Sequence, residues 1–184
     1  MPTIEVPEFK FAIREDIKNQ EGFIPSKKIG SDTGWDVRCA EPEGVILEPF
    51  EHKIIRLGIR MFAPKGWWLE LRPRSSSHAK KHLNCLYGVI DELYEREIGF
   101  SCQYIPPLEG IKINTDVAGI FTKSHIVFDA DIEPLEIKFG ERIGQLIPKK
   151  REYMITSEVS NEDFDKLCEE RQGERGTGGF GSTG

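Results

Sequence analysis

The sequence predicts an all-β domain of the jelly-roll or sandwich kind, with one short helix near the C-terminal end. Two observations indicate this class. Apolar residues fall in short segments, and in two of these, Phe9 to Ile13 and Trp67 to Leu71, they alternate with polar residues at the period of a half-buried strand. Proline and glycine interrupt these segments at intervals that suit many short strands joined by turns.

Four stretches carry the strand pattern most clearly. They are Phe9 to Ile13, in which Phe9, Phe11 and Ile13 alternate with polar residues, Val45 to Leu47, Ile54 to Phe62, and Trp67 to Leu71, in which Trp67, Leu69 and Leu71 share one parity.

One segment has helical spacing. Between Asn161 and Arg171, the residues Phe164, Leu167 and Cys168 recur three and four positions apart, and acidic residues fill the first turn, where the helix dipole favours negative charge. We expect a short helix there, capped by Asn161.

The length of 184 residues predicts one main domain. We place a single β domain at 1–172 and a glycine-rich arm at 173–184.

Hydrophobic residues make up 38% and charged residues 30%, which is typical of a soluble globular protein. No apolar run is long enough to cross a bilayer, and the first residues lack a secretory-signal pattern, so we expect a cytoplasmic protein without membrane contact.

The charge balance argues against a nucleic-acid partner. Twenty-five basic and 31 acidic residues give a net charge of -6, whereas nucleic-acid binding needs a basic face. The segment from Glu70 to His82 is an exception with a local charge of +3, so a small anionic ligand remains possible. The four cysteines are scattered without metal-ligand spacing, and we expect reduced, mostly buried thiols: Cys39, Cys85, Cys102 and Cys168.

Half of the twelve residues from 173 to 184 are glycine. Such a segment is costly to order, so it is either a mobile end without a role or an arm that folds over a ligand. Phe180 offers a stacking surface there, and Arg175 offers a cation.

Gly176, Gly178 and Gly181 match the dinucleotide-binding fingerprint formally, but the helix that must follow is missing.

Four further motifs bear polar groups that suit chemistry, and each has a plainer explanation. Asp36 follows a glycine turn in Gly34-Trp35-Asp36, where an aspartate usually caps. The arginine and serine groups of 72–77 suit phosphate oxygens, or form a solvated basic loop. Asp91 ends an apolar strand, and it is either simply solvated or a general base that activates water. In 140–147, one amide, Gln145, lies among apolar residues and needs a partner.

Taken together and in this order, these five segments resemble the homotrimeric dUTPase family. The most specific piece is the closing Arg175-Gly176-Thr177-Gly178-Gly179-Phe180-Gly181-Ser182-Thr183-Gly184. Gly88-Val89-Ile90-Asp91 with Tyr94, and Gly140-Glu141-Arg142-Ile143-Gly144-Gln145, match nearly as well. The resemblance implies a distorted jelly roll, also called a β-clip, that hydrolyses dUTP with Mg²⁺ as cofactor.

The resemblance also implies a role for each motif. Asp36 would hold water ligands of Mg²⁺, and Asp91 would activate the water that attacks the α-phosphorus. Tyr94 would pack on the deoxyribose and exclude a 2'-hydroxyl. The substrate-binding residues would be Arg74, Ser75, Ser76 and Gln145 at the phosphates, Asn84 and Gly88 near the base, and Arg175, Phe180, Gly181, Ser182 and Thr183 in the arm. Three chains would contribute to each site.

Some positions depart from the family pattern. The asparagine expected six residues before Asp91 is replaced by Cys85, and Asn84 lies one residue earlier, which would turn its side chain to the other face of a strand unless a bulge corrects it. The span from Asp91 to Gly140 is longer than the pattern, so we expect an inserted β excursion at 104–134, either as padding or as a docking surface for another protein.

Two other functions are compatible with parts of the pattern. A dCTP deaminase shares the element around Asp91, but its catalytic glutamate would fall where this chain has Ser101. A nucleotide-binding regulator acting through 104–134 would not need the catalytic groups, all of which are present.

Overall fold

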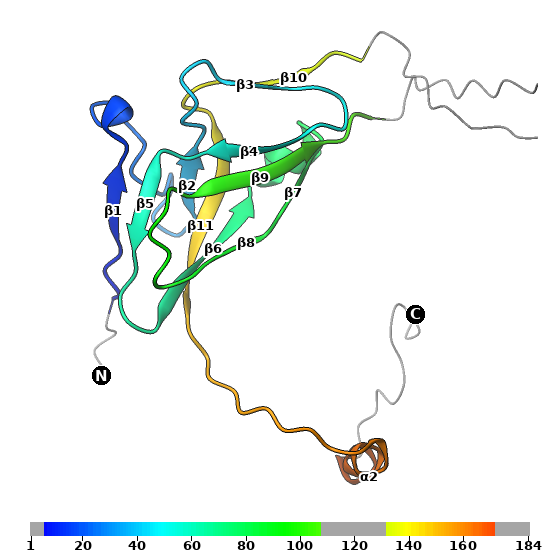
Figure 1. The fold of residues 1–184 in the computed structure, drawn as a ribbon. Coiled ribbons are helices and arrows are strands. Elements are labelled where there is room, and N and C mark those ends of the chain that lie inside the picture. The colour runs from blue at the N-terminus through cyan, green and yellow to red at the C-terminus, as the bar shows by residue number, and fades with distance from the viewer. Residues whose placement is uncertain (1–5, 108–131, 172–184) are drawn as a thin grey trace, which may run out of the picture. The chain divides into compact units, whose positions relative to one another are not determined.

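The computed structural model describes residues 6–107 and 132–171, and it confirms the predicted all-β class (Figure 1). The chain divides into two compact units, residues 1–151 and 152–184. Among the described residues, the first unit contains the strands and a five-residue helix, and the second contains a longer helix.

The helices and strands of the described residues follow one another in this order. They are β1 (Lys10–Ile13), the 3₁₀ turn η1 (Glu15–Ile17), β2 (Trp35–Arg38), β3 (Val45–Leu47), β4 (His52–Arg56), β5 (Ile59–Phe62), β6 (Trp67–Pro73), α1 (Ser75–Ala79), β7 (Leu83–Cys85), β8 (Gly88–Ile90), β9 (Gly99–Tyr104), β10 (Leu135–Ile137), β11 (Arg142–Lys150) and α2 (Asn161–Arg171).

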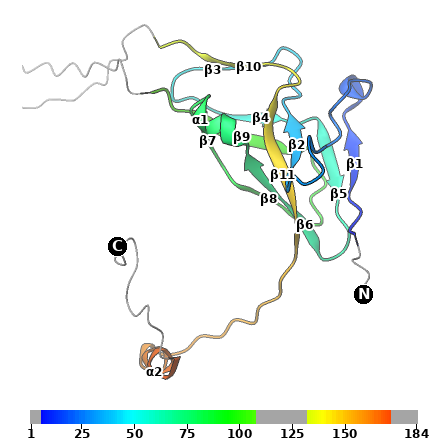
Figure 2. The same cartoon turned by 180° about the vertical axis from the view of Figure 1, so that it is seen from behind.

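The strands form two larger sheets and two strand pairs, all antiparallel. One sheet has the order β2-β11-β6-β8 and the other β4-β9-β7, while β1 pairs with β5 and β10 pairs with β3. Strand β9 lies in front of β11 in Figure 1 and behind it in Figure 2, so the two larger sheets lie face to face.

The core fills the space between these sheets. Phe100 of β9 is fully buried, and a Cβ atom added to Gly144 of β11 would come within 3.1 Å of its ring. Glycine at this position therefore lets the sheets approach. Burial alternates along β9, as the period of a strand requires, and β6 buries Leu69 and Leu71. Each such side chain contributes about 1.5–3 kcal/mol when it leaves water.

The predicted strands are present with small changes in their limits. The stretch from Ile54 to Phe62 is divided into β4 and β5, because the chain turns at Gly58 with φ of 67°. A Cβ atom there would lie 2.2 Å from Ile17 Cδ1, so only glycine fits.

The two α-helices differ in how well the sequence predicted them. Helix α2 has the predicted limits, but its cap is Ser160 and not Asn161: the Ser160 hydroxyl accepts the Asp163 N–H at 3.1 Å and donates to the Asp163 carboxylate at 2.7 Å. Helix α1 was not predicted, because three consecutive serines have neither apolar spacing nor strong helix preference.

All four cysteines are free thiols. Cys39 and Cys102 are buried as predicted, Cys85 is partly buried, and Cys168 is exposed on α2. Burial raises the pKa of the Cys85 thiol to about 11 and that of Cys102 to about 12, which keeps both protonated at neutral pH.

Within the described parts of the chain, no helix has the length and apolar character needed to span a membrane.

Candidate active site

A carboxylate between two arginines forms the centre of the candidate site. Asp36, on β2, accepts a hydrogen bond from Arg142 Nη1 to its Oδ2 at 2.9 Å, and its Oδ1 lies 3.0 Å from Arg74 Nε. The Asp36 side chain is 16% exposed, so these charges are partly shielded from water. The cluster carries a net positive charge in an acidic chain, which suits an anionic ligand.

A β-bulge brings Arg142 into this cluster. Along β11 and β2, Gln145 pairs with Asp36 and Gly144 with Val37, but the register then shifts so that Arg142, and not Ile143, pairs with Arg38. The bulge turns Ile143 into the core, where it is fully buried, and brings Arg142 onto the face of Asp36.

The predicted amide, Gln145, lies directly opposite Asp36 in the sheet. Gln145 is the register partner of Asp36 on one side and of Arg72 on the other, and residues directly opposite share a face. Its Nε2 donates to Pro73 O at 3.4 Å. A Cβ atom on Gly34 would lie 2.2 Å from Gln145 Oε1, so the glycine of the first motif leaves room for this side chain.

Helix α1 carries the predicted serines. Ser75 is exposed and Ser76 is partly exposed, so both hydroxyls are accessible. Ser77 is buried and donates to Ile143 O at 2.7 Å, and Arg74 N–H donates to the same carbonyl at 3.4 Å. The bulged residue therefore also anchors the start of α1 and fixes Arg74 beside Asp36.

The predicted base-reading residues lie on β7 and β8. Asn84 pairs with Gln103 of β9 in regular register, and it is exposed whereas Cys85 is partly buried. No bulge corrects its direction. Asn84 lines a groove of about 480 Å³. Gly88 pairs with Leu71 of β6.

Arg72, the register partner of Gln145, also contacts the loop before β8. Its guanidinium lies 4.8 Å from the centre of the Tyr87 ring, in a cation–π contact, and bonds Glu70 at 2.6 Å. This hydrogen bond from Arg72 lowers the pKa of the Glu70 carboxyl.

The predicted general base follows β8. Asp91 is exposed and begins a turn in which Tyr94 N–H donates to Asp91 O at 3.0 Å. Tyr94 is 37% exposed, and its hydroxyl donates to Glu97 O at 3.2 Å. Among the described residues, the Asp91 carboxylate has no hydrogen-bond or ion-pair partner, which leaves it available to a water molecule.

Within one chain, Asp91 lies far from the Asp36 cluster. Ile90 pairs with Leu69 of β6, so the register puts Asp91 beside Trp68, six positions before Arg74. At about 3.4 Å per residue, this separation is about 20 Å along the strand. The backbones of Asp91 and Arg74 are therefore well separated within one chain.

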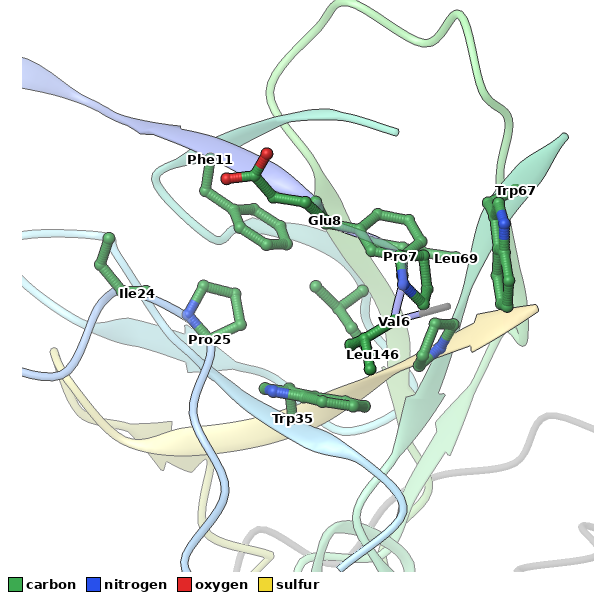
Figure 3. A pocket seen from close by; sticks show the side chains of 12 residues that line it. Val6, Pro7, Glu8, Phe11, Ile24, Pro25, Trp35, Trp67, Leu69 and Leu146 are labelled. Atoms are coloured by element: carbon green, nitrogen blue, oxygen red, sulfur yellow. The ribbon is translucent and has the colours of Figure 1, made fainter. Parts of the chain in front are cut away.

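A large apolar cavity lies elsewhere in the first unit. Figure 3 shows aromatic and aliphatic side chains from β1, β2, β6 and β11 that point into it, among them Phe11, Trp35 and Trp67. Its volume is about 580 Å³, and Glu8 is the charged residue in its lining. None of the predicted site residues lines it, and its walls lack groups to hold a triphosphate.

Comparison with known proteins identifies the family. No protein-family model matches the chain. The mouse (Mus musculus) deoxyuridine 5'-triphosphate nucleotidohydrolase is 30% identical over 166 residues, which is 90% of this chain and 81% of the relative. The corresponding protein of Bdellovibrio bacteriovorus is 30% identical over 178 residues, 95% of this chain and 97% of the relative. This chain belongs to the deoxyuridine 5'-triphosphate nucleotidohydrolase (dUTPase) family.

A solved dUTPase structure agrees with this assignment. The Staphylococcus bacteriophage 80alpha dUTPase with dUPNHPP aligns with a TM-score of 0.69 and 26% identity, and the alignment covers 96% of this chain and 98% of the phage chain. The predicted family and the predicted enzyme class, a nucleotidohydrolase, are therefore confirmed.

The dUTPase motifs are brought together only in part. The structure clusters Asp36, Arg74 and Gln145, and it separates them from Asp91 and Tyr94 in the same chain. Arg175, Phe180, Gly181, Ser182 and Thr183 lie outside the described residues, as does most of 104–134. Sequence analysis gave Arg142 no role, although the residue lies inside a recognised motif, because only the bulge reveals which face it occupies.

The Asp36 cluster would fit Mg²⁺ only together with a phosphate ligand, because both Asp36 oxygens pair with arginines in the free chain. This ion keeps several waters and is usually bound through one or two carboxylates and substrate phosphates. Asp36 supplies one partly exposed carboxylate, and Arg74 and Arg142 supply charge for phosphates. Among the described residues, no group of three or more His, Cys, Asp or Glu could hold a metal alone, so waters and substrate phosphates would supply the remaining ligands.

Replacing Asp36 with asparagine should lower the free energy of unfolding by about 1–3 kcal/mol, because two arginines would lose their shared carboxylate. Urea denaturation measures this change. The control is Glu15→Gln, since the Glu15–Lys18 pair is 82% and 61% exposed and should change stability by less than about 0.5 kcal/mol. Equal effects of the two substitutions would contradict a structural role of the Asp36 cluster.

Proposed function

We propose that this enzyme hydrolyses dUTP to dUMP and pyrophosphate, with Mg²⁺ as cofactor. The observation that carries the proposal is the cluster of Asp36, Arg74 and Arg142 beside Gln145, found in a member of the dUTPase family. Two guanidinium groups and an amide on one face of a sheet are suited to bind and neutralise a triphosphate. The reaction would lower the dUTP concentration and supply the precursor of dTMP.

Arg74 would change partners when the nucleotide binds. Its Nε faces Asp36 in the free chain, and the guanidinium has further N–H groups with which to bind phosphate oxygens. Arg142 would continue to hold Asp36 in place. Bound Mg²⁺ would neutralise phosphate charge, with Asp36 holding its waters, and Ser75, Ser76 and Gln145 would donate to the phosphate chain.

Asp91 would act as the general base. Its exposed carboxylate would accept a proton from a water molecule as that water attacks the α-phosphorus in line, and pyrophosphate would leave. Such a reaction needs positioning and charge neutralisation but no covalent nucleophile. Tyr94 would pack against the deoxyribose, and Asn84 and Gly88 would contact the base.

A complete site would need more than one chain. The separation of about 20 Å between Asp91 and Arg74 is too long for one α-phosphate to reach both. A second copy could bring its Asp91 to the first copy's Asp36 cluster, and a third could supply Arg175, Phe180, Gly181, Ser182 and Thr183. We therefore propose a homotrimer with shared active sites.

The two alternative functions are less well supported. A deaminase would need a carboxylate where this chain has Ser101, and the Ser101 hydroxyl is bonded to His52 Nε2 at 2.8 Å. A regulator acting through 104–134 stays a prediction, because residues 108–131 lie outside the described part of the chain.

A nucleotide panel tests the proposed function. The enzyme should release pyrophosphate from dUTP faster than from dCTP, dTTP or UTP. UTP would be excluded because Tyr94 leaves no room for a 2'-hydroxyl, and dCTP and dTTP would be disfavoured because the groove lined by Asn84 would bind uracil in preference to the other bases. Chelation of Mg²⁺ should abolish release. Ammonia release from dCTP would instead support a deaminase, and inactivity towards all four nucleotides would support a regulator.

Asp91→Asn should bind the nucleotide normally but lower kcat by at least about a hundredfold, as expected when a general base is lost. Stopped-flow or steady-state kinetics measures the rate, and calorimetry with a non-hydrolysable dUTP analogue measures binding. An unchanged rate would remove Asp91 from the assigned role.

Mixing two inactive variants tests the shared site. Arg74→Ala lacks one half of the site and Asp91→Asn lacks the other, so an equimolar mixture refolded together should regain about a quarter of wild-type activity if each site combines two chains at random. Each variant mixed with itself is the control. If the mixture is no more active than its components, each chain holds a complete site.

A further inference from the structure

We propose that Glu92 is a positioning residue for Asp91, acting together with Arg151; this inference rests on the proposed function. Glu92 directly follows the exposed Asp91, yet its own side chain is only 15% exposed. A carboxylate withdrawn from water beside an exposed one needs compensating partners, and Glu92 has two.

These partners form a closed ring of three residues. Glu92 Oε2 accepts the Gly66 N–H at 2.8 Å and also pairs with Arg151 Nη2. The Arg151 N–H in turn donates to Gly66 O at 2.7 Å. The ring therefore joins the end of β8, the turn before β6 and the residue that follows β11.

The ring fixes the direction in which the chain leaves β8. Asp91 itself has no side-chain partner among the described residues, so its position depends on its neighbours. On one side, Ile90 is buried and paired in the sheet. On the other side, the Glu92 side chain is held by Gly66 and Arg151, so the backbone of Asp91 lies between two anchored neighbours.

The far end of the same loop has a similar anchor. Glu97 is 19% exposed and accepts the Gly58 N–H at 2.9 Å, Arg14 Nη1 at 3.0 Å and Arg56 Nη1 at 3.3 Å. Between the anchors, Leu93 is 82% exposed and Tyr94 is 37% exposed. Two carboxylates thus hold the ends of the short segment that carries Tyr94, and the proposed general base, Asp91, directly precedes the first of them.

If Glu92 and Arg151 position Asp91, their loss should lower the rate of hydrolysis without weakening nucleotide binding. A misplaced base lowers the fraction of complexes in which water is aligned, while the groups that bind the nucleotide are unchanged. We therefore expect Glu92→Gln and Arg151→Met each to lower kcat for dUTP about tenfold, with KM within about twofold of wild type. Arg151→Lys keeps the charge and should retain most of the rate.

A double-mutant cycle and a matched control complete the test. Because the ring acts as a unit, the Glu92→Gln/Arg151→Met double variant should be no slower than either single variant. The control is Glu51→Gln: Glu51 also accepts a backbone N–H, that of Glu48, and pairs with Lys53, and its loss should leave kcat unchanged.

The outcomes separate this inference from the proposed function. Wild-type enzyme without dUTP hydrolysis would overturn the proposed function. An active wild type with unchanged kcat in Glu92→Gln, or with an equal loss in Glu51→Gln, would overturn the role of Glu92. If Glu92→Gln does not fold, Arg151→Met decides, since its side chain is 43% exposed: an unchanged kcat in that variant overturns the proposal.

Discussion

The carbonyl group of Ile143 is the point on which the candidate site depends. Ile143 is the extra residue of a bulge in β11, and the bulge turns its side chain into the core while its carbonyl accepts the Ser77 hydroxyl at 2.7 Å. The same shift brings Arg142 beside Asp36. One backbone irregularity thus joins a core position, the start of α1 and the charged cluster, so the packing of Ile143 and the geometry of the site cannot vary independently.

Asp36 offsets part of the charge of the two arginines before any ligand binds, and the cluster keeps a net positive charge. Asp36 lies between Arg74 and Arg142, which avoids the cost of partly buried like charges and holds both guanidinium groups in place. An incoming phosphate would compete with Asp36 for Arg74 and leave the Arg142 contact intact. The rearrangement would thus be confined to Arg74, which has to leave Asp36, while Arg142 keeps its position.

The sequence predicted the repeating features well and the irregular ones poorly. Alternation predicted β1 and β6, a short apolar stretch predicted β3, and helical spacing predicted the limits of α2. The role of Arg142 was missed, since a bulge changes which face a residue occupies without a signal in composition. Helix α1 was missed because a buried hydroxyl, that of Ser77, stabilises it through a contact 66 positions away. The order of the motifs identified the family, but only strand register separates Asp91 from Arg74.

Strand β6 explains why the site is divided. Gln145 pairs with Arg72 near one end of β6, whereas Ile90 pairs with Leu69 towards the other, and the stiffness of a paired strand holds these positions apart. A single antiparallel sheet cannot fold its two ends together without breaking its ladder. If the phosphates bind at the Asp36 cluster and Asp91 acts as the base, as we propose, the two groups would meet across an interface between chains. The Glu92 ring and the Ile143 bulge belong to different parts of the sheet, so each would hold its own group in place before the proposed interface forms.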